Sequence, residues 1–293
     1  MFSRLADRAE ATVRQLESLW SRFLPESELM RLNDHAGSAF GVSPDTFAIL
    51  GFAVEAWTLT DGLFDPTLLD ALIDAGYDRS FDHLHNAAEI PGIAESGVRS
   101  GVPPTEIGFD RETFSVTLPA GLRLDLGGIG KGRTADIVVS MLERGGADGA
   151  CVDLGGDIAL FGERAEAQPW AVAVDDPAQP GTDLAMLILE EGAVATSSRV
   201  RRHWRTPAGD THHLIDPRTG RSATSDLVAV TVVAAEAMWA EVYAKAALIA
   251  GSNAGTELLE RAGLSALLVT EDAQLLPVGA IDRFMIPMGM NSQ

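Results

Sequence analysis

The spacing of hydrophobic and polar residues changes along this chain, from helical periods in its first third to shorter alternating runs after residue 106. Residues 4–20 mix charged and apolar side chains at helical spacing and predict a helix. Residues 45–60 predict a buried helix, and Pro66 marks the start of another. Residues 80–105 are polar with several glycines and prolines, which indicates a loop-rich surface region.

Short apolar runs after residue 106 predict strands, and longer amphipathic or apolar stretches between them predict helices. The expected strands are 114–118, 122–126, 150–154, 170–174, 185–190, 192–197, 228–234, 265–270 and 273–277, and the expected helices are about 134–144, 236–250 and 253–262. This mixed order predicts an α/β or layered α+β fold with a substantial sheet. No stretch resembles an interdomain linker, so we expect one domain over residues 1–293, or two intertwined subdomains.

Composition narrows the classes of function. The formal net charge of −20 disfavours binding to nucleic acids and to anionic membranes. The single cysteine, Cys151, excludes an intramolecular disulfide. No stretch approaches the length of an apolar membrane span, and residues 1–20 lack the apolar region of a signal peptide. We therefore expect a cytoplasmic enzyme without a membrane span.

The segment from Leu124 to Asp136 carries the clearest chemical signal. An expected strand runs into a glycine-rich turn, then Lys131, then a helix, and this order favours binding of a phosphate. It is not a Walker A loop, because Asp125 stands where the first glycine would be and Gly132 replaces the hydroxyl residue. The alternative is a tight turn with a solvent-exposed lysine.

A second candidate segment, residues 211–221, follows the most basic stretch of the chain. Arginine forks suit phosphate oxygens, so the stretch indicates an anion site, with a solvated hairpin as the alternative. His212 and His213 would point to opposite sides of a strand, so at most one of them faces a given site. Asp216 begins a sequence typical of a turn.

Two further groups of residues are weaker candidates. Thr196 lies near the end of an expected strand, where its hydroxyl could bind phosphate or metal or could cap a turn. Glu241 and Lys245 are four residues apart in an expected helix, and an ordinary helix ion pair is the alternative to a functional role.

Taken together, these segments resemble the ApbE family, the FAD:protein FMN transferases. The matching segments, in chain order, are residues 23–33, 62–67, 125–136, 153–157, 195–197 and 212–220. No single segment decides the match, but all of them occur in the order of the family. The resemblance implies a T-fold-like architecture of mixed sheets packed by helices.

The resemblance also implies a reaction. Members bind FAD, and many transfer its FMN half to a threonine or serine hydroxyl of an acceptor flavoprotein, releasing AMP with the help of magnesium or another divalent cation. Two alternatives stay open for this chain. It could hydrolyse FAD to FMN and AMP, or it could bind FAD without transfer.

The resemblance assigns roles to residues of this chain. The residues implied to bind FAD are Phe23, Ala75, Gly76, Tyr77, Asp125, Lys131, Thr196 and Lys245. The residues implied to take part in catalysis are Lys131, His212, His213 and Asp216, and the implied metal ligands are the Gly128 carbonyl and Glu241.

One helix departs from the pattern of the family. The usual Ala-Asp-Ala-Leu-Ala-Thr-Ala reads Ala-Glu-Val-Tyr-Ala-Lys-Ala over residues 240–246. Glu241 keeps an oxygen ligand for a hard cation, whereas Lys245 cannot ligate one. We expect Lys245 to oppose a bound cation or to replace it as a fixed positive charge.

Overall fold

The computed structural model describes residues 2–84, 102–164, 167–179, 181–206 and 209–286. The chain forms two compact units, and each is assembled from segments that are distant in the sequence. Unit 1 comprises Met1–Val13, Lys131–Ser198 and Ser225–Gln293, and unit 2 comprises Arg14–Gly130 and Arg199–Thr224.

Unit 1 is built on an antiparallel six-stranded sheet with the order β15-β14-β13-β8-β5-β4. Its strands are β4 (Gly149–Asp153), β5 (Asp157–Gly162), β8 (Gly192–Ser198), β13 (Leu227–Ala234), β14 (Ser265–Thr270) and β15 (Leu275–Val278). A smaller antiparallel sheet, β16-β7-β6, consists of β6 (Trp170–Asp175), β7 (Asp183–Leu189) and β16 (Met285–Ile286).

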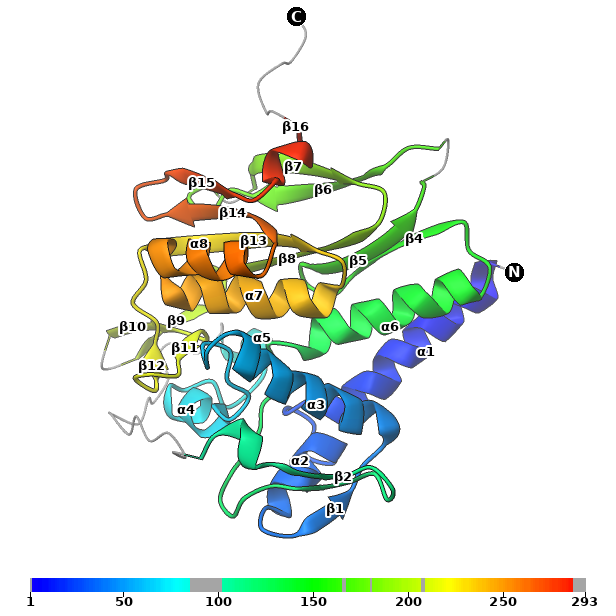
Figure 1. Cartoon of the computed structure of the whole chain (residues 1–293), viewed down its shortest axis with the longest axis vertical. Helices are drawn as coiled ribbons and strands as arrows, with labels where there is room; N and C mark the ends of the chain where they lie inside the picture. Colours follow the sequence, from blue (N-terminus) through cyan, green and yellow to red (C-terminus); the bar gives the residue numbers. More distant parts are fainter. Residues whose placement is uncertain (1, 85–101, 165–166, 180, 207–208, 287–293) are drawn as a thin grey trace, which may run out of the picture. The chain divides into compact units, whose positions relative to one another are not determined.

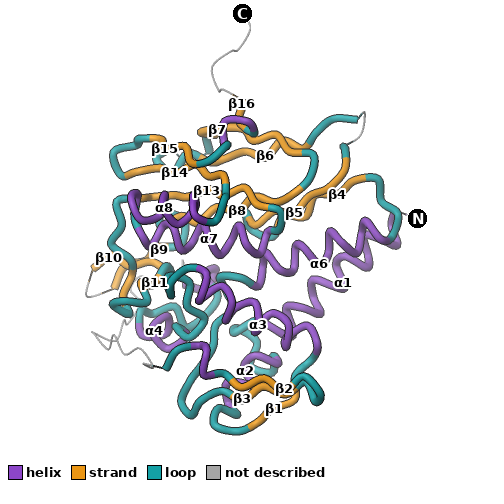
Figure 2. Tube along the Cα trace, in the orientation of Figure 1, coloured by secondary structure: helices purple, strands orange, loops and turns teal. Residues whose placement is uncertain are grey.

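Helices cover one face of the six-stranded sheet (Figures 1 and 2). They are α6 (Gly130–Arg144), α7 (Ala237–Ala250) and α8 (Ser252–Arg261), and the short η2 (Ile281–Arg283) follows β15. Alanines make the contact between helices and sheet: Ala135 of α6, Ala159 of β5, Ala193 of β8 and Ala237 of α7 pack together. These small side chains allow the helices to approach the strands closely.

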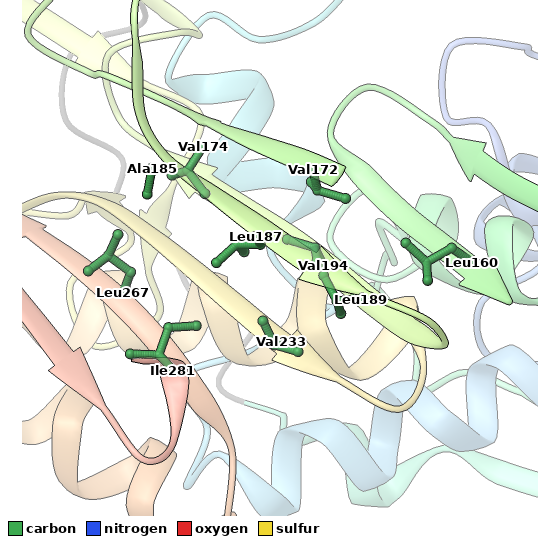
Figure 3. Packing of buried hydrophobic residues seen from close by; sticks show 10 residues of the cluster. All are labelled: Leu160, Val172, Val174, Ala185, Leu187, Leu189, Val194, Val233, Leu267 and Ile281. Atoms are coloured by element: carbon green, nitrogen blue, oxygen red, sulfur yellow. The ribbon is translucent and has the colours of Figure 1, made fainter. Parts of the chain in front are cut away.

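The opposite face of the six-stranded sheet packs against β6 and β7, as Figure 3 shows. Leu160 and Val194 directly follow Ala159 and Ala193 in their strands, so they point away from the helices and into this second core. Leu187 of β7 is fully buried there. Unit 1 therefore has three layers: the helices, the six-stranded sheet and the smaller sheet. Alternate side chains of β5 and β8 pack against the layer on either side of the six-stranded sheet.

Unit 2 is mainly helical with small antiparallel sheets. Its helices are the later part of α1 (Phe2–Trp20), α2 (Glu28–Asp34), α3 (Pro44–Leu59), α4 (Leu69–Asp74), α5 (Phe81–Leu84) and η1 (Pro104–Glu106). Its strands are β1 (Ala39–Gly41), β2 (Gly108–Asp110) and β3 (Ser115–Thr117), which form one sheet, and the hairpins β9 (His203–Thr206) with β10 (Gly209–His212) and β11 (Ile215–Asp216) with β12 (Arg221–Ser222).

The mixed α/β architecture expected from the sequence is confirmed, and most predicted elements lie within a few residues of the observed ones. The strand expected over 122–126 is wrong. Leu122, Leu124 and Leu126 are buried as the alternation predicts, but the backbone of Leu124 bonds to the Asn33 side chain at 2.8 and 2.9 Å. A side-chain amide thus takes the place of a neighbouring strand.

Other boundaries also differ from the expectation. Helix α4 begins at Leu69 rather than at Pro66, and α6 begins at Gly130 rather than near Thr134. The elements α2 and β5 were not predicted, whereas β9 and β10 form the hairpin given as the alternative for the basic stretch. Most of the loop-rich region expected over residues 80–105 lies outside the described residues. Within the described part of the chain, no helix has the length and apolarity needed to span a membrane.

Leu187→Ala tests the core between the two sheets of unit 1. Removing a fully buried leucine should lower the free energy of unfolding by about 2–4 kcal/mol, because the strands cannot close over the lost volume. Ile286→Ala in the adjacent β16 is the control, since Ile286 is 50% exposed and should matter little. Urea denaturation measures both, and equal losses for the two variants would contradict this packing.

Candidate functional site

The first candidate site lies in unit 1, where one lysine contacts two carboxylates. Lys131 comes from the first turn of α6, Asp157 from the start of β5 and Glu241 from α7. The Lys131 ammonium forms ion pairs with Asp157 Oδ2 and with Glu241 Oε1. Both carboxylate side chains are 6% exposed, whereas the lysine side chain is 34% exposed. We call these three residues the lysine–carboxylate cluster.

A tight turn positions Asp157 in this cluster. Gly155 and Gly156 join β4 to β5 with φ angles of 72° and 95°, which residues with a side chain rarely adopt. The Gly156 N–H donates to Asp153 Oδ1 at 2.8 Å, and the Leu154 N–H donates to the Asp157 carbonyl. The second Asp-Leu-Gly-Gly of the chain is therefore a hairpin turn that presents Asp157 at the start of a buried strand.

A close helix approach positions Glu241. Its second oxygen, Oε2, accepts the backbone N–H of Gly132 at 2.9 Å. A Cβ atom at Gly132 would lie 2.5 Å from the Ala237 carbonyl oxygen, so only glycine lets the start of α6 lie this close to the start of α7. The glycine after Lys131 thus permits the contact between lysine and glutamate.

Asp136 of α6 holds the same two helices together one turn later. Its carboxylate accepts the N–H groups of Ala237 at 2.7 Å and of Met238 at 3.0 Å, and so caps the first turn of α7 from another helix. Burial raises the pKa of Asp136 to about 6, although these two hydrogen bonds act in the opposite direction. Nearby Glu236 raises this pKa further, and Arg133 lowers it.

The charges of the cluster are strongly coupled. Burial and the Glu241 carboxylate raise the pKa of Asp157 to about 7, against the opposing effect of Lys131. Burial also opposes the charge of Lys131, but the two carboxylates outweigh it and raise the lysine pKa. Lys131 therefore stays protonated, and two of its three N–H donors bond to carboxylates.

This arrangement does not fit a divalent cation ligated by Glu241. Both oxygens of Glu241 already bond to Lys131 and Gly132, and the ammonium lies where a metal would meet the two carboxylates. Across the residues that the structure describes, no group of three or more His, Cys, Asp or Glu side chains is arranged to hold a metal ion. The other implied ligand, Gly128, is a buried residue of unit 2.

Thr196 and Lys245 also belong to unit 1. Thr196 is exposed on β8, and its hydroxyl hydrogen-bonds the hydroxyl of Thr231 on β13 at 2.9 Å. Lys245 is half-buried on α7, one turn after Glu241. Their implied roles in binding FAD stay predictions.

The second candidate site lies in unit 2, where one guanidinium contacts two neighbouring aromatic rings. The Arg22 guanidinium carbon is 4.4 Å from the Phe23 ring centroid and 4.3 Å from that of Tyr77. Its Nε atom is 3.4 Å from Asp125 Oδ1, and its Nη1 atom donates to the Tyr77 carbonyl at 2.7 Å. We call Arg22, Phe23 and Tyr77 the arginine–aromatic stack. The stack and its ion-pair partner Asp125 group three residues implied to bind FAD: Phe23, Tyr77 and Asp125.

The aromatic contacts continue beyond the stack. Tyr77 follows the Ala75-Gly76 end of α4 and packs against Trp204 at 5.4 Å and against His213 at 6.4 Å between ring centroids. The Trp204 indole donates to the Ala75 carbonyl at 2.9 Å. The segment from Ala75 to Tyr77, which is implied to bind FAD, thus belongs to an aromatic cluster.

The two adjacent histidines differ in their surroundings. Both ring nitrogens of His212 hydrogen-bond to backbone, with Nε2 3.1 Å from the Ala223 carbonyl oxygen and Nδ1 accepting the Leu214 N–H at 3.3 Å. Burial lowers the pKa of His212 and favours its neutral form. These bonds are typical of a structural histidine. The His213 ring packs against that of Tyr77, and its Nδ1 atom lies 3.4 Å from the Arg202 carbonyl oxygen.

Asp216 organises the turn that follows β11. Its carboxylate accepts the backbone N–H and the guanidinium of Arg218 at distances of 2.8 to 3.1 Å. Its carbonyl accepts the N–H groups of Thr219 and Gly220. The turn expected from the sequence is present, and the carboxylate is engaged within it.

Arg22 and Asp157 were not among the candidates from sequence. Arg22 directly precedes Phe23, and Asp157 directly follows the second Asp-Leu-Gly-Gly, so their positions carried a local signal. The small number of lysines was a second signal in the sequence. The chain has only two lysines, Lys131 and Lys245, and they lie on the adjacent helices α6 and α7.

Comparison of the sequence with known proteins gives a consistent result. The model of the ApbE family matches residues 2–268. The FAD:protein FMN transferase of Treponema pallidum is 31% identical over 292 residues, covering 94% of this chain and 79% of the relative. The FAD:protein FMN transferase of Vibrio cholerae is 28% identical over 271 residues, covering 91% and 79%.

Solved structures share the fold. The ApbE protein of Thermotoga maritima aligns with a TM-score of 0.84 at 24% identity, over 97% of this chain and 92% of that one. The apo flavinyl transferase ApbE of Pseudomonas stutzeri aligns with a TM-score of 0.80 at 23% identity, over 97% and 89%. At these identities the structures establish a common fold.

Lys131→Met tests the lysine–carboxylate cluster. It leaves two buried carboxylates without their cation and should lower the free energy of unfolding by about 3 kcal/mol. Adding Glu241→Gln should recover part of that loss, because one of the two like charges is then gone. Lys245→Met, at the only other lysine, is the control and should cost less. Urea denaturation of the wild type, Lys131→Met, Glu241→Gln and the double variant gives the coupling, and strictly additive effects would argue against a shared cluster.

Asp136→Asn tests the cap on α7 through its pH dependence. Folding raises the pKa of Asp136 from 3.8 to about 6, so the folded state binds the extra proton between these values. The resulting stability is complete below the unfolded pKa and is lost as the pH rises through the folded pKa. The wild type should therefore lose on the order of 2 kcal/mol relative to Asp136→Asn between about pH 4 and about pH 7.

Denaturation of the wild type and Asp136→Asn at several pH values measures this difference. Asp110→Asn is the control, since Asp110 is an exposed carboxyl whose pKa is lowered, chiefly by its hydrogen bond with Thr113. Its difference from the wild type should show no such fall. A pH-independent difference for Asp136→Asn would show that the carboxyl does not titrate in this window.

Proposed function

Because the chain belongs to the ApbE family, we propose that it transfers the FMN half of FAD to a serine or threonine hydroxyl of an acceptor protein and releases AMP. The observation that carries the proposal is the match of nearly the whole chain to relatives named FAD:protein FMN transferase. The grouping of Phe23, Tyr77 and Asp125 in unit 2 supports it, because aromatic rings suit a planar heterocycle.

The proposed reaction is a substitution at phosphorus. The acceptor hydroxyl oxygen bonds to the phosphorus on the flavin side of FAD, and the bond from that phosphorus to the bridging oxygen breaks. AMP leaves with the bridging oxygen, and the hydroxyl proton passes to a base. Such a reaction depends on positioning and on stabilisation of the charge that develops on the phosphate oxygens.

Several residues suit these tasks. Lys131 is protonated and one-third exposed, and its third N–H remains to bond to a phosphate oxygen of FAD. A histidine of the 212–213 pair is a candidate for the base: both ring nitrogens of His212 bond to backbone, and Nδ1 of His213 lies 3.4 Å from the Arg202 carbonyl oxygen. Asp216 suits it less well, since Arg218 engages its carboxylate.

Magnesium is the least supported part of the family pattern in this chain. A divalent cation would stabilise charge on the phosphates, but the contacts of Glu241 do not fit a metal ligand. We therefore assign no step to a metal. The ammonium groups of Lys131 on α6 and Lys245 on α7 are the candidate cations, and that of Lys131 also pairs with two carboxylates.

Incubation of the purified protein with FAD and an acceptor flavoprotein domain, with magnesium or with a chelator, tests the proposal. We expect AMP to appear in step with covalent flavin fluorescence on the acceptor. Lys131→Met should slow AMP release by about 100-fold, as expected for loss of a group that stabilises developing charge. Arg79→Gln, which alters an exposed arginine, is the control.

The alternatives give different results in the same assay. AMP and free FMN without a labelled acceptor would indicate hydrolysis of FAD. Bound FAD without AMP would indicate a binding protein. No binding of FAD at micromolar concentration would refute all three readings.

A further inference from the structure

One nitrogen of Arg22 is buried without a hydrogen-bond partner. The side chain is 6% exposed, and its Nε and Nη1 atoms are directed to Asp125 and to the Tyr77 carbonyl. The remaining atom, Nη2, is inaccessible to solvent and has no acceptor among the residues that the structure describes. The arginine–aromatic stack therefore contains a charged hydrogen-bond donor that lacks an acceptor within the described chain.

Such an atom needs an explanation, because buried donors of folded proteins nearly always have acceptors. The guanidinium carbon lies over the rings of Phe23 and Tyr77, 4.4 and 4.3 Å from their centroids, and the rings attract its positive charge. Contact with a ring face does not satisfy an N–H group that lies in the plane of the guanidinium. An acceptor supplied by a ligand would satisfy it.

The surroundings of Arg22 select the kind of acceptor. Asp125 lies 3.4 Å from Nε and already balances the positive charge. A phosphate would bring further negative charge beside that carboxylate, whereas a carbonyl oxygen or a ring nitrogen would bring none. The flanking aromatic side chains also suit a flat heterocycle. The stack thus favours a neutral acceptor on a planar ring.

We propose that Arg22 Nη2 donates a hydrogen bond to a neutral acceptor atom of one of the two ring systems of FAD. This inference rests on the proposed function and deepens it by naming the donor that recognises a ring. Both the isoalloxazine and the adenine offer such acceptors, and binding measurements distinguish them.

Access to Nη2 requires one of the covering groups to move, and Phe23 is suited to do so. Its ring lies over the guanidinium, is 38% exposed, and belongs to the irregular segment between Trp20 of α1 and Glu28 of α2. Tyr77, in contrast, is 8% exposed and packs against Trp204. The ligand ring would thus take over part of the surface that Phe23 covers.

Arg22→Lys and Arg22→Gln test the proposal by titration calorimetry with riboflavin, FMN, adenosine and FAD. Lysine keeps the charge beside Asp125 but lacks the Nη2 donor, and glutamine keeps a neutral donor of shorter reach. We expect Arg22→Lys to weaken FAD about tenfold or more, and to weaken either riboflavin or adenosine similarly while leaving the other unchanged. The affected compound identifies the ring.

The control is Arg31→Lys, which alters an arginine that also lies over a ring, 5.3 Å from the Phe40 centroid, but is exposed. It should bind all four compounds as the wild type does. Thermal unfolding of each variant shows whether the fold is kept, and Arg22→Gln provides a second folded variant if lysine is not tolerated.

Three results would overturn the inference. Unchanged binding of riboflavin and adenosine to both Arg22 variants would show that Nη2 reads neither ring. Weaker binding of FMN, with unchanged binding of riboflavin and adenosine, would show that Arg22 contacts a phosphate instead of a ring. Equally weaker binding of riboflavin and adenosine, together with a lower melting temperature, would indicate that Arg22 has a structural role. Release of AMP from FAD by the wild type tests the proposed function separately, so the two failures are distinguishable.

Discussion

The contact of Lys131 with Asp157 and Glu241 is the constraint on which the arrangement of unit 1 depends. Two carboxylates buried side by side repel each other and lose hydration, so they require a cation between them. Satisfying that requirement draws α6, β5 and α7 together. Gly132 makes the approach sterically allowed, and the cap that Asp136 places on α7 fixes it. The small side chains where these helices meet the six-stranded sheet follow from the same close packing.

The lysine–carboxylate cluster also explains the role of Glu241, one of the residues in the helix that departs from the family pattern. A glutamate at position 241 is long enough to reach Lys131 with one oxygen and the Gly132 N–H with the other. The carboxylate is thereby committed to the protein itself. In this chain the Lys131 ammonium contacts both carboxylates and offsets part of their negative charge.

In unit 2 the buried charge is the guanidinium of Arg22. The Arg22 stack buries a guanidinium with one carboxylate, one carbonyl and two ring faces around it. The charge is balanced, but one directional N–H donor is not. Electrostatic attraction between charges depends little on angle, whereas a hydrogen bond requires a defined direction. The Nη2 donor, which is unpaired within the described part of the chain, therefore requires an acceptor at one particular position. That property suits recognition of a ring by its edge.

The sequence by itself determined the local order of the chain: the periods that give α3, α7 and the strands of unit 1, the turn at Asp216, and the order of segments that identifies the family. It did not show that Leu124 bonds to Asn33 while residues 122–126 join no sheet, nor that Lys131 contacts both Asp157 and Glu241. The reason is physical. Periodicity reports which face of a segment is buried, whereas the partners of a polar group can be as far away as the 110 residues between Lys131 and Glu241. Only the packed structure decides which of them meet.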